Sequence, residues 1–260
     1  MRVPVVQHTT RRQRARRRRA LWTGGELLVT AGLVLLLLVV HQLWWTNREA
    51  RRGAERKVEA LERQWGGRAT DKGDDSGTSV PATTPQPRSG SSTRNRQQTT
   101  TAAAQPRPSW SQAYAILTIP RLGLRVPVAE GVSKQNVLNQ GYVGHYRGTG
   151  QPGQVGNFAL AGHRNTHGEP FRYINRLQAK DVVEVETKTA TYTYAVDRTL
   201  PQTSARDSGV VRPIPRSIVE PRYGYSEPGY YITLTTCTPE YTSRYRLVVW
   251  GKLVSMRPRS

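Results

Sequence analysis

Apolar residues are distributed unevenly along the 260-residue chain, and their pattern divides it into four parts. Residues 1–20 are basic, residues 21–46 contain a continuous apolar run, residues 47–109 are polar, and residues 110–256 alternate between apolar and polar positions. Only the last part has enough apolar residues to form a core, and its length suits one domain. We therefore expect a basic tail, a membrane anchor, a juxtamembrane stalk with a flexible linker, and one folded domain.

The run from Leu27 to Trp45, LLVTAGLVLLLLVVHQLWW, is 19 residues long, and about 20 apolar residues are needed to cross a bilayer as a helix. A cleavable signal peptide would have a shorter apolar stretch and a small-residue cleavage site, whereas Trp44, Trp45 and Thr46 end this run. Eight arginines and no acidic residue lie within residues 2–19, and such a flank stays in the cytoplasm. The pattern predicts a single-pass protein of the cell membrane with a cytoplasmic N-terminus and an extracellular domain.

Two polar segments follow the anchor. Residues 47–64, NREARRGAERKVEALERQ, are charged and rich in helix formers, which fits either a juxtamembrane helix or a solvated, partly ordered stalk. Residues 66–108 are mainly Gly, Ser, Thr, Pro, Gln and Arg, a composition that buries too little apolar surface to offset the entropy of ordering. We expect this second segment to be a disordered tether that lets the domain work at a distance from the membrane.

From Tyr114 onward, short runs rich in Val, Ile, Thr and Tyr are separated by Gly, Pro and Asn clusters, as is typical of strands and turns. Many strands at short spacing with few helical periods predict a mostly β domain, either an antiparallel sandwich or a barrel. Short helices are expected near 133–139 and 170–176. The expected strands are Ala115–Ile119, a segment around Val126–Pro127, Asn157–Ala161, Val182–Thr187, Thr191–Asp197, Tyr230–Thr236 and Leu247–Val254.

The formal net charge is +21, from 39 Lys and Arg against 18 Asp and Glu, and clustered basic residues can bind nucleic-acid phosphates. Most of the excess lies in the tail and the linker, and the predicted strands contain no aromatic and basic RNA-binding motif. We therefore do not expect nucleic acid as a partner. The sequence also contains no clear acidic cluster for calcium, and we expect neither a metal nor a cofactor.

The single cysteine, Cys237, excludes an intrachain disulfide and is either a reactive thiol or an inert buried residue. In the strand that precedes it, Ile232 and Leu234 share the apolar face, so that Cys237 lies at the strand end on the other face. A polar loop follows, and Arg246 opens the next strand, so that a wide hairpin would bring Cys237 and Arg246 together. A nearby guanidinium favours the thiolate and can stabilise an oxyanion.

A reactive thiol needs a proton partner, and histidine suits neutral pH best. His8 lies in the tail and His41 in the anchor, which leaves His145, His163 and His167. His163 follows a predicted strand in GNFALAGHRNTHG and lies beside a Gly-flanked turn, a favourable place for a site residue. His145 and His167 fit loop residues or local hydrogen-bond partners better, and we predict His163 as the proton carrier.

Several local motifs around these residues carry a family resemblance. TLTTC at 233–237, followed by an arginine at the start of a strand, and AGHR at 161–164 resemble the Thr-Leu-x-Thr-Cys, downstream Arg and histidine motifs of the sortase family of cysteine transpeptidases. ILTIPRLGLRVPV at 116–128 and GHYRGTGQPGQVGNFALAGHR at 144–164 add to the resemblance. It covers nearly all of 114–254 and is greatest to the class E sortases of actinobacteria, which are Gram-positive bacteria.

The resemblance implies a sortase-like antiparallel β-barrel with short helices over 110–256. It implies that Cys237 is the nucleophile, His163 the acid and base, and Arg246 the cation that stabilises the oxyanion and orients the substrate. Thr236 matches a family threonine that shapes the substrate groove. Arg244, seven rather than nine residues beyond the cysteine, is the nearest alternative to Arg246 and falls in the connecting loop.

The implied reaction cleaves a C-terminal sorting signal of the Leu-Ala-x-Thr-Gly or Leu-Pro-x-Thr-Gly type between Thr and Gly through a thioester on Cys237. The acyl group then passes to a cell-wall amine. The implied partners are secreted proteins with such signals, a peptidoglycan or lipid-linked precursor amine, and the membrane. Two alternatives remain open, a cysteine peptidase that uses water as acceptor and a non-catalytic, tethered β-domain that binds a partner. The Pro- and Ser-rich connection at 202–228 is the expected wall for substrate selection.

Overall fold

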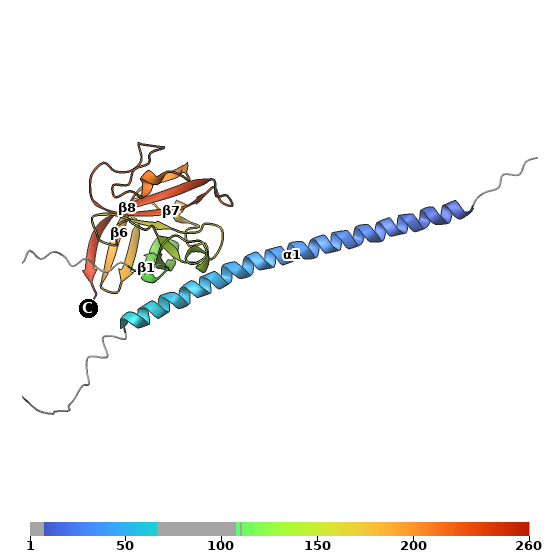
Figure 1. Cartoon of the computed structure of the whole chain (residues 1–260), viewed down its shortest axis with the longest axis horizontal. Coiled ribbons are helices and arrows are strands. Elements are labelled where there is room, and N and C mark those ends of the chain that lie inside the picture. Colours follow the sequence, from blue (N-terminus) through green and yellow to red (C-terminus); the bar gives the residue numbers. More distant parts are fainter. Residues whose placement is uncertain (1–7, 67–107, 110, 260) are drawn as a thin grey trace, which may run out of the picture.

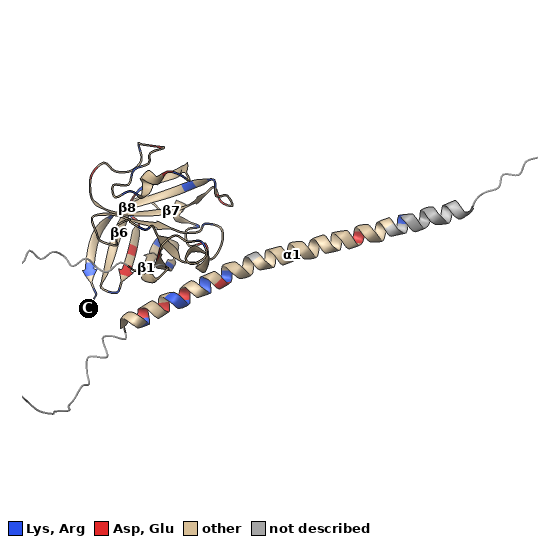
Figure 2. Cartoon of the chain, in the orientation of Figure 1, with Lys and Arg blue, Asp and Glu red and all other residues tan. Residues whose placement is uncertain are grey.

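The N-terminal apolar run forms the middle of one long helix, α1 (His8–Gly66), in the computed structural model, which describes residues 8–66, 108–109 and 111–259. At about 1.5 Å per residue the helix is roughly 90 Å long. Within it, residues 21–66 contain a stretch long and apolar enough to cross a membrane. Charged residues are concentrated in the third of α1 nearest the β domain, while its middle is almost free of them (Figure 2). The linker expected at 66–108 lies almost entirely outside the described residues.

The last third of α1 lies beside the β domain and packs against it (Figure 1). Its buried residues, at helical spacings of four, four and three, form one stripe. They are Ala50, Ala54, Val58 and Leu61. Of the two structures considered for residues 47–64, the helix is the one observed, and it is docked on the domain instead of standing as a solvated stalk.

Eight strands form a closed barrel in the order β1-β2-β3-β4-β7-β8-β6-β5. The strands are β1 (Ala113–Ile119), β2 (Leu124–Glu130), β3 (Val143–His145), β4 (Gly156–Ala161), β5 (Val182–Thr187), β6 (Ala190–Ser204), β7 (Tyr230–Thr238) and β8 (Tyr245–Pro258). The pairs β2–β3 and β4–β7 are parallel and the others antiparallel. The predicted mostly β barrel is confirmed, and closure leaves no unpaired sheet edge.

Helical structure within the domain is limited to single 3₁₀ turns. They are η1 (Pro120–Leu122), η2 (Leu138–Gln140), η3 (Ile174–Arg176) and η4 (Ser208–Val211). Two of these turns, η2 and η3, lie where short helices are expected, near 133–139 and 170–176. The three-residue strand β3 was not predicted, because so short a segment carries no alternation that could reveal it.

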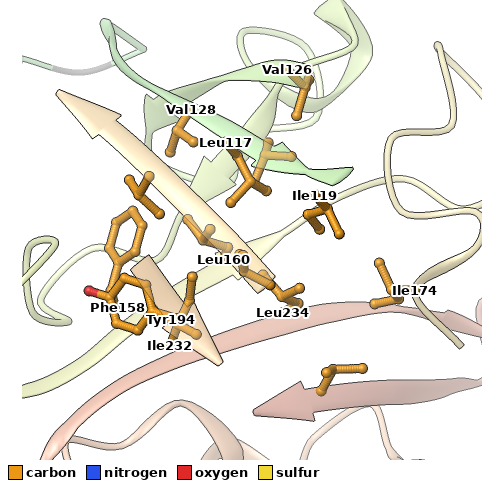
Figure 3. Close-up of a cluster of buried hydrophobic side chains, with 14 of the residues drawn as sticks. Leu117, Ile119, Val126, Val128, Phe158, Leu160, Ile174, Tyr194, Ile232 and Leu234 are labelled. Atoms are coloured by element: carbon orange, nitrogen blue, oxygen red, sulfur yellow. The ribbon is translucent and has the colours of Figure 1, made fainter. Parts of the chain in front are cut away.

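The barrel interior is filled by alternate residues of the strands, including Leu117 of β1, Leu160 of β4 and Leu234 of β7 (Figure 3). In β7 this inward row includes Ile232 and Leu234, the face predicted to be apolar. The opposite face of β7 is buried as well, because a second cluster with Tyr231 and Trp250 covers it. Strand β7 is therefore covered on both sides until it reaches its C-terminal end.

The connection at 202–228 supplies this second cover. The carbonyl oxygen of Val210 accepts hydrogen bonds from Trp250 Nε1 at 3.2 Å and from Thr233 Oγ1 at 3.3 Å. Val210 and Tyr225 also pack in the apolar cluster on this face. The segment thus lies over the outer face of β7 and β8.

Candidate active site

The hairpin of β7 and β8 brings Cys237 and Arg246 together. Cys237 lies one residue before the end of β7 and Arg246 one residue after the start of β8, and the two are direct partners in the antiparallel register. Side chains at directly opposed positions share one face of a sheet. Cys237 is partly exposed, unlike the fully covered Thr235 two residues earlier on that face.

Cys237, Arg246 and His163 line one cleft of about 680 Å³. The other walls come from α1, from the connection between β2 and β3, from the loop after β4 and from the loop between β7 and β8. They include Trp44, Thr46, Asn47, Lys134, Arg164, His167, Glu169 and Tyr241. No residue of the 202–228 connection is among the described residues that line this cleft. The contacts of Val210 hold that segment over the outer face of the hairpin, and its role in substrate selection stays a prediction.

His163 lies two residues beyond β4, within a network that fixes its ring. Its Nε2 lies 2.9 Å from Asn139 Oδ1, and its ring stacks on His167 with centroids 5.3 Å apart. Because an amide oxygen only accepts, Nε2 carries the proton and the lone pair of the neutral ring is on Nδ1. Burial, followed by the charges of His167 and Lys134, lowers the pKa of His163 to about 4. At neutral pH this ring is therefore neutral and able to accept a proton.

Arg246 is held by the loop that precedes it. Its Nη1 donates to the carbonyl oxygens of Ser243 at 2.9 Å and Tyr245 at 3.0 Å. Arg244 is exposed, and its guanidinium lies over the ring of Tyr245 with 5.2 Å to the ring centroid. Of the two arginines, Arg246 lines the cleft beside Cys237 and Arg244 does not.

Thr236 lies directly before Cys237, on the inward face of β7. It is 3% exposed and continues the inward row of Ile232 and Leu234. Its hydroxyl donates to the carbonyl oxygen of Gly162 at 2.8 Å, and Thr236 is not among the residues that line the cleft. It therefore fastens β7 to the residue before His163, behind the cleft, and its part in shaping the substrate groove stays a prediction.

Arg164 was missed by the sequence reasoning, although it is part of the AGHR motif. Its side chain is 7% exposed, and Nη1 donates to the carbonyl oxygen of Cys237 at 3.2 Å and to Thr238 Oγ1 at 2.9 Å. A buried guanidinium needs such partners, because an unpaired buried charge is very costly. Arg164 thus ties the loop that carries His163 to the backbone of the candidate nucleophile.

The contribution of α1 was also missed, because residues 47–64 were given no role in chemistry. Asn47 Oδ1 accepts a hydrogen bond from the Gly168 amide at 2.6 Å, and Arg51 forms an ion pair with Glu169 at 3.0 Å. The buried stripe of Ala50, Ala54, Val58 and Leu61 is the signal that could have revealed this contact, since its spacing places the four residues on one helical face. Among the described residues, no group of three His, Cys, Asp or Glu side chains could hold a metal ion.

Residues 117–254 match the family model described as a sortase domain. The chain is 51% identical over 154 residues to Sortase SrtE1 of Streptomyces coelicolor, an alignment that covers 57% of this chain and 42% of that protein. It is 35% identical over 217 residues to Sortase SrtE2 of the same organism, covering 82% of this chain and 73% of that protein. The chain thus spans less than half of SrtE1 and nearly three quarters of SrtE2.

Solved structures give the same result. The crystal structure of Sortase E1 from Streptomyces coelicolor, which holds a tripeptide in its active site, has a TM-score of 0.54 at 51% identity and is matched over 57% of this chain and 92% of that chain. The structure of sortase E from Streptomyces avermitilis has a TM-score of 0.51 at 39% identity and is matched over 58% of this chain and 93% of that chain. The barrel topology and these matches point to the same family.

Proposed function

Since the chain belongs to the sortase family, we propose that it is a membrane-anchored cysteine transpeptidase of the class E type. The observation that supports this most directly is the register of the hairpin, which sets Cys237 opposite Arg246 in a cleft that His163 also lines. These three side chains supply the nucleophile, the cation and the proton carrier that acyl transfer needs.

In the first step, Cys237 Sγ attacks the carbonyl carbon of the threonine in a sorting signal, and the thiol proton passes to His163 Nδ1. Arg246 stabilises the negative charge that develops on the carbonyl oxygen. Collapse of the tetrahedral intermediate breaks the Thr–Gly bond, and the imidazolium of His163 returns the proton to the leaving glycine amine. The product is a thioester on Cys237. The low pKa of His163 supports this order of events, because the ring begins each cycle as a base.

In the second step, an amine attacks the thioester carbonyl and loses a proton to His163, and Cys237 is released as a thiol. We propose a peptidoglycan amine, free or in a lipid-linked precursor, as this acceptor. The acyl donor is a secreted protein with a C-terminal signal of the Leu-Ala-x-Thr-Gly or Leu-Pro-x-Thr-Gly type. Basic side chains at the cleft, among them Lys134, Arg164 and Arg246, suit the oxyanion and a thiolate.

The proposed location is the cell membrane, with α1 as a single-pass anchor, the N-terminus in the cytoplasm and the β domain outside. The apolar stretch of α1 is long enough to span a membrane, and the arginines that precede it favour the cytoplasm. Secreted substrates and lipid-linked acceptors both reach the outer face of that membrane.

The test is mass spectrometry of the full chain in lipid nanodiscs, incubated with a Leu-Ala-x-Thr-Gly or Leu-Pro-x-Thr-Gly peptide, with and without an amine donor. We expect a peptide cleaved after Thr and joined to the amine, and no product from Cys237→Ala. Cleavage without joining for every amine would indicate the peptidase that uses water. No reaction, together with a Cys237 thiol that resists alkylation, would indicate the non-catalytic binding domain.

A further inference from the structure

We propose that the juxtamembrane part of α1, residues 44–51, belongs to the active site and positions His163 by holding both segments that contact its ring. This inference rests on the proposed function of His163 as proton carrier. One of the two segments is the loop 167–169, which carries the stacking partner of His163. The other is η2 and the residue after it, which carry the hydrogen-bond partner of His163.

The loop 167–169 has an unusual backbone. His167, Gly168 and Glu169 have φ values of 51°, 85° and 53°, and non-glycine residues adopt this left-handed region only at a cost. Such a conformation persists only where surrounding contacts determine it. Because His167 stacks on His163, any relaxation of this loop would move a group that contacts the catalytic ring.

Helix α1 supplies three of the contacts that hold this loop, and Arg172 adds an ion pair with Glu169 at 2.7 Å. Asn47 Oδ1 accepts from the Gly168 amide at 2.6 Å, and Arg51 Nε donates to the Gly168 carbonyl oxygen at 3.1 Å. Arg51 Nη2 also bonds to the carboxylate of Glu169 at 3.0 Å, which is itself 9% exposed. Both polar groups of the Gly168 backbone are therefore bonded to α1, within two turns of the end of the apolar run.

The second segment is packed directly on the helix backbone. Gly141 has a φ of 80°, and a Cβ atom there would lie 2.6 Å from the carbonyl oxygen of Ala50. Asn139, two residues earlier, accepts the hydrogen bond from His163 Nε2. The close approach of α1 at Gly141 therefore fixes the position of the group that sets the tautomer of the catalytic ring.

Both segments that contact the His163 ring are held by α1. If α1 undocked, the loop of His167 and the turn of Asn139 would be released together. His163 would then lose its stacking partner and its hydrogen-bond partner at once. Trp44 and Thr46 would also leave the wall of the cleft. Since the apolar run ends at Trp45, the docked helix holds the cleft at the level of the membrane surface, where the proposed acceptor lies.

The experiment compares Arg51→Ala with Arg52→Ala in the full chain in nanodiscs. Arg52 is exposed on the same helix and serves as the matched control. We expect Arg51→Ala to lower kcat for peptide cleavage at least about tenfold with KM nearly unchanged, because a shift of about 1 Å at a catalytic group costs up to ~10²-fold. We expect Arg52→Ala to behave as the wild type.

A second readout separates positioning from general destabilisation. The His163 ring is titrated by NMR in the same samples, where its wild-type pKa is about 4. In Arg51→Ala the ring becomes more hydrated, and its pKa should rise toward the ordinary value of 6.5. A loss of stability alone would lower the melting temperature without moving this titration.

A pair of glycine substitutions tests the second contact. Gly141→Ala places a methyl group against the Ala50 carbonyl, whereas Gly148→Ala has a similar φ of 78° and no heavy atom within 4 Å of the new Cβ. Both carry the same backbone cost, so only the contact with α1 differs. We expect Gly141→Ala alone to raise the pKa of His163.

The outcomes distinguish the two proposals. If Arg51→Ala and Gly141→Ala leave both kcat and the His163 titration at the wild-type values, the role of α1 is overturned. If the wild type transfers no peptide but both variants shift the titration, the transpeptidase proposal fails and the bracing of His163 by α1 stands.

Discussion

At the residue scale, the site depends on pairing charged groups that would otherwise be costly to bury. Arg164 is 7% exposed and is bonded to the Cys237 carbonyl and the Thr238 hydroxyl. Arg246 is partly exposed and has two carbonyl partners in its own loop. Arg164 is thus paired with groups of the protein itself. Arg246 lies in the cleft, where its guanidinium can also bind a developing oxyanion.

The distinction between Arg246 and its neighbour leads to a prediction. Arg246→Ala should lower kcat for peptide cleavage by about 10²- to 10³-fold, the usual cost of losing one oxyanion donor. Arg244→Ala should change kcat less than about twofold, because its side chain contacts the Tyr245 ring at the surface. Single-turnover kinetics of both variants measure this difference, and equal losses would contradict the assignment of Arg246.

The pH dependence follows from the low pKa of His163. Burial, His167 and Lys134 lower this pKa to about 4, so kcat/KM for cleavage should fall only as the pH drops through about 4, where the base becomes protonated. Lys134→Gln removes a nearby positive charge, and we expect the acidic limb to move to higher pH. Lys188→Gln, exposed in the turn between β5 and β6, is the control.

The low pKa of His163 also affects folding stability, because the unfolded chain binds a proton at this histidine more readily than the folded chain does. Between pH 6.5 and about 4 the unfolded chain binds the proton that folded His163 does not, so this residue lowers folding stability as the pH falls through that window. Above pH 6.5 it contributes nothing. An acidic limb of kcat/KM near 6.5 in the wild type would contradict both statements.

At the element scale, strand β7 organises the site by dividing its residues between two faces. Its inward row includes Thr236, whose hydroxyl donates to the Gly162 carbonyl, and its outward row ends at Cys237. The alternation in the sequence predicted this division, and the polar loop before Arg246 predicted the hairpin that pairs Cys237 with Arg246. Alternation alone does not reveal what covers the outer face, so the packing of Val210 and Tyr225 of the 202–228 connection on it could not be predicted.

Thr236→Val tests the role of the inward row. The substitution keeps the shape but leaves the Gly162 carbonyl without its partner, and it should cost about 1–3 kcal/mol of folding stability. Because Thr236 does not line the cleft, kcat should fall more than KM rises. Thr118→Val is the matched control, since the Thr118 hydroxyl is buried without a partner in the described part of the chain, and it should be neutral or slightly stabilising.

The long helix shows where sequence reasoning fell short. The apolar run of 27–45 and the helix formers after it were sufficient to predict an anchor and a possible juxtamembrane helix. The stripe from Ala50 to Leu61 was overlooked because charged residues outnumber it, and two of its four members are alanines, which carry little apolar signal. Docking of the helix also depends on contacts with residues distant in sequence, such as Gly168 and Glu169. The spacing of apolar residues along a helix does not identify such partners.

At the scale of the whole molecule, the domain is held by the helix that carries it. The expectation was a domain at a distance from the membrane at the end of a flexible tether. In the structure, Glu62 of α1 forms an ion pair with Arg125 at 2.7 Å, and the guanidinium of Arg259 lies over the ring of Trp65. The last turns of α1 are therefore fastened to β2 and to the C-terminal segment, and Asn47 and Arg51, several turns earlier, to the loop beside His163.

This arrangement makes the proposed topology testable with the native residues. Cys237 is the only cysteine of the chain, and it is partly exposed in a cleft beside the end of the apolar run. A small, membrane-impermeant thiosulfonate added to intact cells should therefore modify the wild type without permeabilisation. Mass spectrometry of the purified chain measures the modification.

The control moves the thiol to the other side of the membrane. In the double variant His8→Cys and Cys237→Ala, the cysteine lies among the N-terminal arginines, and we expect modification only after the cells are permeabilised. The arginine run and the exclusion of its charges from the bilayer are the physical reason for this asymmetry. If the double variant were labelled in intact cells and the wild type were not, the orientation would be the opposite of the one proposed. Cys237 would then lie on the other side of the membrane from the proposed acceptor.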